Sequence, residues 1–163
     1  MLSLRAMAGK KKKKIEGPVV LAKNKRARHE YHIHEVFEAG IVLGSSEIKS
    51  IRAGQCSITE AFGRIRDGEV WLMGMHVAEY FEATFNNHIT RRNRKLLLHN
   101  AEIRKLSRKL KVSGYTLVPL DIHLSESGFA KVNIALCSGK KEHDKRQDMK
   151  KRDSDREMRS YIR

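Results

Sequence analysis

Residues 115–137 read YTLVPLDIHLSESGFAKVNIALC, in which two apolar-rich segments flank a short polar one. Segments 115–124 and 129–137 have the length and composition of strands. The four residues between them, SESG at 125–128, form a hairpin loop of ordinary length. This stretch therefore predicts two antiparallel strands joined by a tight connection.

Further strand patterns precede this hairpin. Asp67-Gly68 is a two-residue turn signal between two of them, which predicts a second hairpin. Closing about six strands into a small antiparallel barrel leaves no exposed sheet edge. We therefore expect a mainly β fold, a small closed barrel. Its expected strand segments are residues 30–36, 41–43, 58–66, 69–73 with a continuation over 75–80, 115–124 and 129–137.

Two other segments carry helix signals. Ser45 begins a segment with an early acid, apolar residues three apart and a terminal Gly54, which predicts a short helix. After a polar loop at 82–93, Asn100 precedes an apolar stripe that stops at Gly114. For the fold as a whole, we expect about three short helices around the barrel.

The basic charge of the chain, +15 in total, is concentrated at its ends. Residues 1–28 carry ten Lys and Arg against one acid, and residues 139–163 carry ten against six. The middle, residues 29–138, carries fourteen against twelve, but nine of its basic residues lie between positions 91 and 111. Clustered positive charge is typical of a protein that binds a polyanion, and we interpret the partner as RNA.

The chain divides by composition into one domain with two tails. Residues 1–23 lack apolar periodicity and are expected to be a flexible basic arm. Residues 24–138 are long enough for one core and form the expected RNA-binding β-barrel domain. Residues 139–163 contain few large apolar side chains, which predicts a disordered basic C-terminal tail.

That tail nevertheless has a bias toward helix. Asp148 with Arg152, and Asp155 with Arg159, are acid-first pairs four residues apart. Each such pair stabilises a helix by roughly 0.2–0.5 kcal/mol, too little to secure an isolated one. We therefore expect a tail that becomes helical on a partner.

Several function classes have no support in the sequence. Cys56 and Cys137 lack a second thiol at metal-binding spacing, and His32 and His34 on one strand face are too few for zinc, so no metal or cofactor is expected. No apolar run approaches the roughly 20 residues of a membrane span, and a cytoplasmic protein without membrane contact is expected. Glu38 and Glu47 could form a catalytic pair, but acids among basic residues more often bind RNA or orient Arg side chains.

Six ordered segments resemble the SsrA-binding protein family, also called small protein B. They are NKRARHEY (24–31), FEAGIVL (37–43), SEIKSIRAG (46–54), RKLLLH (94–99), GYTLVPL (114–120) and GKKEHDKR (139–146). The resemblance implies a bacterial cytosolic factor of trans-translation with an oligonucleotide-binding-like barrel and no enzymatic activity. It also implies binding to the tRNA-like domain of transfer-messenger RNA. The resemblance further implies that this RNA carries alanine, is delivered with elongation factor Tu and enters stalled ribosomes. A monomer is expected.

The resemblance also implies site residues. The implied RNA-binding positions, with Leu97 acting by packing, are Asn24, Lys25, Arg26, Arg28, Glu38, Leu97, Lys131, Gly139, Lys140 and Lys141. The tail positions implied to enter the decoding region and the empty mRNA channel are His143, Asp144, Lys145 and Arg146.

The chain departs from the family pattern in two places. Ile89 and Thr90 stand where the family usually has Asp-Pro, and Ser138 stands where a basic residue is frequent. Two alternatives to the family role remain open at this point. One is a ribosomal or ribosome-assembly protein with a small barrel, and the other is a small ribonuclease using Glu38, Glu47 and a histidine.

Overall fold

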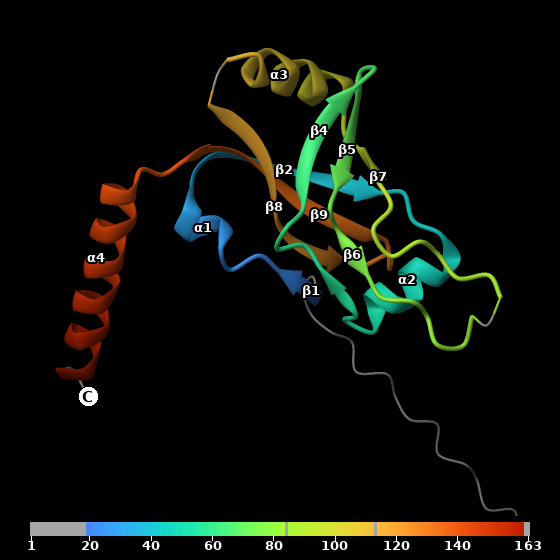
Figure 1. The fold of residues 1–163 in the computed structure, drawn as a ribbon, viewed down its shortest axis with the longest axis horizontal. Helices are drawn as coiled ribbons and strands as arrows, with labels where there is room; N and C mark the ends of the chain where they lie inside the picture. The colour runs from blue at the N-terminus through green and yellow to red at the C-terminus, as the bar shows by residue number, and fades with distance from the viewer. Residues whose placement is uncertain (1–18, 84, 113, 162–163) are drawn as a thin grey trace, which may run out of the picture.

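The structure of the chain is a computed structural model that describes residues 19–83, 85–112 and 114–161. Most of the predicted N-terminal arm, residues 1–18, lies outside the described residues. Within the described part, helices and strands follow the order shown in Figure 1. The helices are α1 (Ala27–Glu30), α2 (Ser45–Arg52), α3 (Asn100–Leu110) and α4 (Glu142–Tyr161). The strands are β1 (Val19–Lys23), β2 (Tyr31–Ile41), β3 (Cys56–Ser57), β4 (Phe62–Arg66), β5 (Glu69–Met73), β6 (His76–Val77), β7 (Arg94–Leu97), β8 (Tyr115–Leu124) and β9 (Ala130–Gly139).

The strands of the main sheet close into a ring. Their order is β1-β8-β4-β5-β7-β2-β9. Strand β8 also pairs with β9, and this pairing closes the strands from β8 to β9 into a ring. All these pairings are antiparallel. The prediction of a mainly β, closed antiparallel fold is confirmed.

Strand β8 is long enough to take two neighbours along one edge. Near its start, Leu117 pairs with Gly63 of β4, and its last residues, Asp121 to Leu124, pair with β1. The end of the predicted arm, residues 19–23, therefore belongs to the sheet. The arm prediction was wrong there because an apolar strand can fill the edge that β4 leaves open.

The core lies inside the ring and is sealed by α3. Leu106 of α3 is completely buried against the barrel interior, beside Leu117 and Ile134. The ring is tight at Gly63, where an added Cβ would lie only 2.7 Å from both Ile134 Cδ1 and Leu117 Cβ. Helix α3 crosses one end of the barrel at the top of Figure 1, and α2 lies toward the other end.

Some predicted elements change in extent. Strand β8 matches its prediction, and β9 and α3 match closely. The two segments expected at 30–36 and 41–43 are one continuous strand, β2. Of the strand expected at 58–66, only β4 is extended, because a turn occupies residues 59–60. Of the continuation expected at 75–80, only β6 is extended, and it follows a bend at Gly74.

Besides β1 and the two-residue β3, two short elements were not predicted at all. Strand β7 follows the polar loop directly, and α1 is a single turn held at its start by Asn24. Both are too short to carry a periodic apolar pattern, and tertiary pairing decides them.

The tail has the helix bias that its sequence predicts, since α4 is a helix, one of four in the described residues. None of the side chains at 142–160 is buried, and α4 extends away from the barrel in Figure 1. Its helicity agrees with the acid-first spacing, and one such pair, Glu142 with Arg146, forms at 3.7 Å.

Candidate nucleic-acid interface

The strand register places three predicted site residues on one outer face of the barrel. Leu97 of β7 pairs with Gly40 of β2, which pairs with Lys131 of β9, which pairs with His123 of β8. Directly paired residues in an antiparallel sheet point to the same side. In the neighbouring row, Glu38 pairs with Asn133, and Asn133 pairs with Asp121. These two rows are named the outer-face rows.

Helix α1 packs on the same outer face, farther along the strands. Ala27 is buried against Val118 and Leu120 of β8 and against Ala135 and Cys137 of β9. The basic segment around α1 and the outer-face rows therefore belong to one side of the molecule.

Glu38 is held by two partners in the outer-face rows, the ammonium group of Lys131 and the imidazole ring of His123. Its Oε2 accepts from Lys131 Nζ at 2.7 Å, and its Oε1 lies 2.9 Å from His123 Nε2. The hydrogen bond from Lys131, followed by that from His123, lowers the pKa of the Glu38 carboxyl. About half of the side chain, 50%, remains exposed. Glu38 is therefore an ionised carboxylate in a fixed position that still faces solvent.

Leu97 contributes an apolar surface beside this carboxylate. Its side chain is 54% exposed, and it lies over Gly40, where an added Cβ would be 3.5 Å from Leu97 Cβ. Leu97 is therefore available to a partner, in addition to the packing role expected for it.

Asn24 has a structural role that the sequence does not reveal. It is 5% exposed, its Oδ1 accepts from Ala27 N at 3.1 Å, and its Nδ2 donates to Pro119 O at 3.2 Å. It thus fixes the start of α1 and ties it to β8. Asn24 therefore positions α1, and its role in RNA binding stays a prediction.

The basic residues of α1 remain on the surface. Lys25, Arg26 and Arg28 are exposed. Arg26 shares its charge with Glu30, whose Oε1 lies 2.7 Å from Arg26 Nη2. Exposed Lys and Arg side chains at this spacing suit phosphate oxygens.

Lys140 is a second predicted site residue that makes structural contacts. Its side chain is only 8% exposed, and its Nζ donates to Arg28 O at 2.9 Å and forms an ion pair with Asp148. Lys140 therefore joins the end of β9 to α1 and to the tail instead of offering a free charge. Its neighbours differ: Gly139 pairs with Tyr31 through the backbone, and Lys141 is exposed.

The predicted tail motif forms the first turns of α4. Asp144 Oδ2 accepts from Lys141 N at 3.3 Å and lies 3.4 Å from His32 Nε2 of β2, so Asp144 anchors the helix start. His143 and Arg146 are exposed, and Lys145 is partly exposed.

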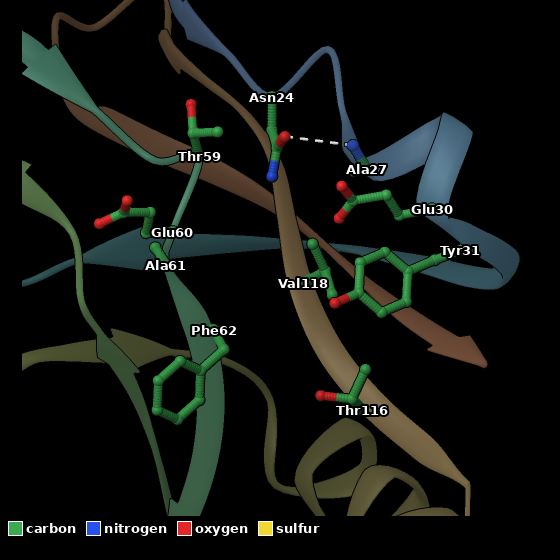
Figure 2. A pocket seen from close by; sticks show the side chains of 10 residues that line it. All are labelled: Asn24, Ala27, Glu30, Tyr31, Thr59, Glu60, Ala61, Phe62, Thr116 and Val118. Carbon is green, nitrogen blue, oxygen red and sulfur yellow. Dashed lines mark hydrogen bonds between the residues drawn. The ribbon is translucent and has the colours of Figure 1, made fainter. Parts of the chain in front are cut away.

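A cleft of about 300 Å³ lies beside this basic segment, between α1 and the segment leading into β4 (Figure 2). Phe62 is 43% exposed at its lower rim, and Tyr31 faces it from the other side. The carboxylates of Glu30 and Glu60 also line the cleft. Negative charge makes it unsuited to phosphate, so phosphate contacts are expected outside it.

Glu47, the second carboxylate of the ribonuclease alternative, is completely buried. Burial opposes its ionisation, but hydrogen bonds from Arg92 and the Gly44 backbone, together with the charge of Arg94, lower the pKa of Glu47 overall. Glu38 and Glu47 thus bind separate sets of partners. Glu47 lacks the exposure that a catalytic acid or base needs, and it serves to join α2 to the segment containing β7.

Three residues of the outer-face rows, Asp121, His123 and Asn133, were not predicted as site residues from the sequence. Asp121 Oδ1 accepts from Asn133 Nδ2 at 2.9 Å and lies 3.2 Å from His123 Nδ1. A sequence signal for them existed, because Asp121 and His123 are polar residues two positions apart and residues at this spacing lie on one strand face. The strand register that places these residues beside Glu38 could not be predicted from the sequence.

Two negative findings concern only the described part of the chain. No group of three or more metal-ligating side chains gathers there. No helix within it is long and apolar enough to cross a membrane.

Comparisons with known proteins agree on one family. A family model described as SmpB protein matches residues 21–163. The SsrA-binding protein of Thermobifida fusca is 51% identical over 158 residues, which cover 96% of this chain and 98% of that protein. The SsrA-binding protein of Mycolicibacterium smegmatis is 50% identical over 139 residues, which cover 85% of this chain and 86% of that protein.

A solved structure is also similar to the fold. It is described as "tmRNA-SmpB: a journey to the center of the bacterial ribosome". The similarity has a TM-score of 0.63 at 46% identity, and it covers 77% of this chain and 85% of that chain.

Proposed function

The chain belongs to the SmpB protein family, and from this membership we propose that it binds the tRNA-like domain of transfer-messenger RNA and acts as an adaptor in ribosome rescue. The observation that carries the proposal is the register that sets Glu38, Lys131 and Leu97 on one outer face beside the basic residues of α1. A closed ring of strands makes this surface rigid. A rigid surface suits a partner that is itself a folded RNA.

The surface offers each type of contact that a structured RNA requires. Lys25, Arg28 and Lys141 are exposed cations for phosphate oxygens. The ionised Glu38 accepts hydrogen bonds, which suits base amino groups and 2′-hydroxyls. Leu97 supplies an exposed apolar contact. Binding of this kind requires no chemical step by the protein.

The tail has a separate role in the proposal. Residues His143 to Arg146 begin a helix of 20 residues, which spans about 30 Å at about 1.5 Å per residue. An exposed helix of this length, in a tail that carries ten Lys and Arg against six acids, fits an RNA-walled channel that is empty only when no message fills it. We assign to the tail the sensing of the empty mRNA channel next to the decoding region.

Other partners follow from the same role. The RNA carries alanine and arrives with elongation factor Tu, and the protein acts in the cytoplasm as a monomer. The outer-face rows bind the RNA, which leaves α4 on the far side of α1 for the ribosome.

The test is an affinity purification of the tagged full chain from a bacterial lysate, followed by sequencing of the bound RNA. The expected result is enrichment of one small structured RNA with a tRNA-like end. Enrichment of ribosomal RNA alone would instead support the ribosomal-protein alternative. Degraded fragments that accumulate with time would support the ribonuclease.

A further inference from the structure

His123 is the most enclosed titratable group of the outer-face rows. It is 5% exposed, and each of its ring nitrogens faces a carboxylate. Nε2 lies 2.9 Å from Glu38 Oε1 of β2, and Nδ1 lies 3.2 Å from Asp121 Oδ1 of β8. The ring therefore bridges two acids that come from different strands.

This geometry specifies the charge of the ring. An ionised carboxylate only accepts hydrogen bonds, whereas a neutral imidazole has one donor nitrogen and one acceptor nitrogen. A neutral ring would direct a lone pair at one of the two carboxylates. Only the doubly protonated ring donates to both Glu38 and Asp121.

The surrounding charges support the imidazolium. Lys131 of β9 neutralises the second oxygen of Glu38, and Asn133 of β9 donates to Asp121. On the other side, β1 places Val20 opposite His123 and exposed Lys23 opposite Asp121. The ring thus contacts two acids, Glu38 and Asp121, whereas the two lysines, Lys131 and Lys23, are its neighbours on β9 and β1.

From this arrangement we infer that protonated His123 is a positioning residue for RNA binding, which holds the Glu38 carboxylate in the orientation that the RNA meets. The inference rests on the proposed function of Glu38. Loss of the ring proton removes one of the two hydrogen bonds, so the ring no longer bridges the two carboxylates and no longer fixes Glu38 relative to Asp121. Binding should therefore weaken as the pH rises.

The first experiment is a double-mutant cycle on binding to the tRNA-like domain at fixed salt and about pH 6, where free histidine is largely protonated. Glu38→Gln and His123→Gln are each expected to weaken binding by about fivefold or more, and the double variant by little more than the worse single one. Effects that multiply would overturn the inference, because His123 would then act independently of Glu38.

The second experiment repeats the binding at about pH 8.5, where an ordinary histidine is neutral. The wild type should lose more affinity than either His123→Gln or Glu38→Gln. His34→Gln is the matched control, because His34 lies on β2 and contacts Ser138 Oγ at 2.8 Å. It should retain the wild-type pH dependence. A His123→Gln variant with the wild-type pH dependence would contradict the inference.

A third measurement needs no RNA. The ring signals of His123 in a nuclear magnetic resonance pH titration should show its proton lost at lower pH in Glu38→Gln than in the wild type. An unchanged titration would refute the bridging role. This measurement does not use His123→Gln, so it tests the inference even if that variant fails to fold. If the wild type does not bind the RNA at either pH, the proposed function fails, while the titration still tests the bridge.

Discussion

Arg94 Nη2 lies 2.8 Å from Glu47 Oε1, and neither side chain is exposed to solvent. Arg94 Nη1 also donates to Met75 O at 2.9 Å and to Arg92 O at 3.0 Å. The pair thus connects α2, β7 and the segment before β6 through one buried ionic contact. A charge left alone at this position would be costly, since it has no water to replace its partner.

We predict that Glu47→Gln destabilises the fold by about 3–5 kcal/mol, because it leaves Arg94 buried without its counter-ion. Urea unfolding followed by circular dichroism measures this. Glu60→Gln is the matched control, since the Glu60 and Arg91 pair, at 3.4 Å, is mostly exposed. Its expected cost is about 0–1 kcal/mol. Equal effects of the two variants would show that the buried pair has no special role.

The same pair predicts a dependence of stability on pH. The pKa of Glu47 is lowered in the folded chain, so the unfolded state binds its proton first as the pH falls. The contribution of Glu47 is therefore fully present above its ordinary pKa of 4.5 and is lost as the pH falls through the folded value. Unfolding measured across this acid range should show a shallower loss in Glu47→Gln than in the wild type.

Glu38→Ala should separate binding from stability. Because Glu38 is half exposed, its removal is expected to change the thermal unfolding midpoint little. Its loss as an acceptor is expected to weaken binding to the tRNA-like RNA by about tenfold or more. Filter binding at fixed salt measures this, and salt must be fixed because phosphate contacts respond steeply to it. Unchanged affinity would remove Glu38 from the interface.

Asn24→Ala should behave differently, although both residues are implied by the same resemblance. The substitution removes the side-chain acceptor at the start of α1 and leaves Pro119 O without its buried donor. The expected cost is about 1–2 kcal/mol of folding stability. RNA affinity should fall only through displacement of α1. A stability equal to wild type, measured by thermal unfolding, would contradict the structural role.

Removal of residues 147–163 should leave the barrel and its RNA binding intact. The core contains no residue of α4, and Lys140 keeps its contact with Arg28 O when Asp148 is lost. Thermal unfolding should therefore be nearly unchanged. The affinity for the tRNA-like RNA should change by no more than about threefold, or about 0.6 kcal/mol.

Peptide tagging on ribosomes stalled without a codon should nevertheless collapse in the truncated chain. Replacing Lys145 and Arg146 by Glu should have a similar effect, since repulsion from RNA costs on the order of a kcal/mol per charge. Normal tagging by the truncated chain in a reconstituted system would show that α4 has no sensing role.

Much of the fold follows from patterns within single segments. Alternation and turn residues identify β8, β9 and the turn between β4 and β5, and the apolar stripe with its flanking residues identifies α3. These signals depend on a few neighbouring residues, so they can be read without knowing the rest of the chain. The charge layout is equally local, and with the six motif segments it indicated RNA and the family.

The roles of individual site residues were decided only when distant strands paired. Glu38 and His123 are 85 positions apart, and Asn24 and Pro119 are 95 apart, yet each pair is in contact. A polar residue in a sequence does not show whether it will face solvent or be enclosed, because that depends on the register of neighbouring strands and on what covers them. The docking of α1 on β8 therefore buried Asn24, contacts with α1 and α4 enclosed most of the Lys140 side chain, and strand pairing set Glu38 beside a histidine that no local pattern connects to it.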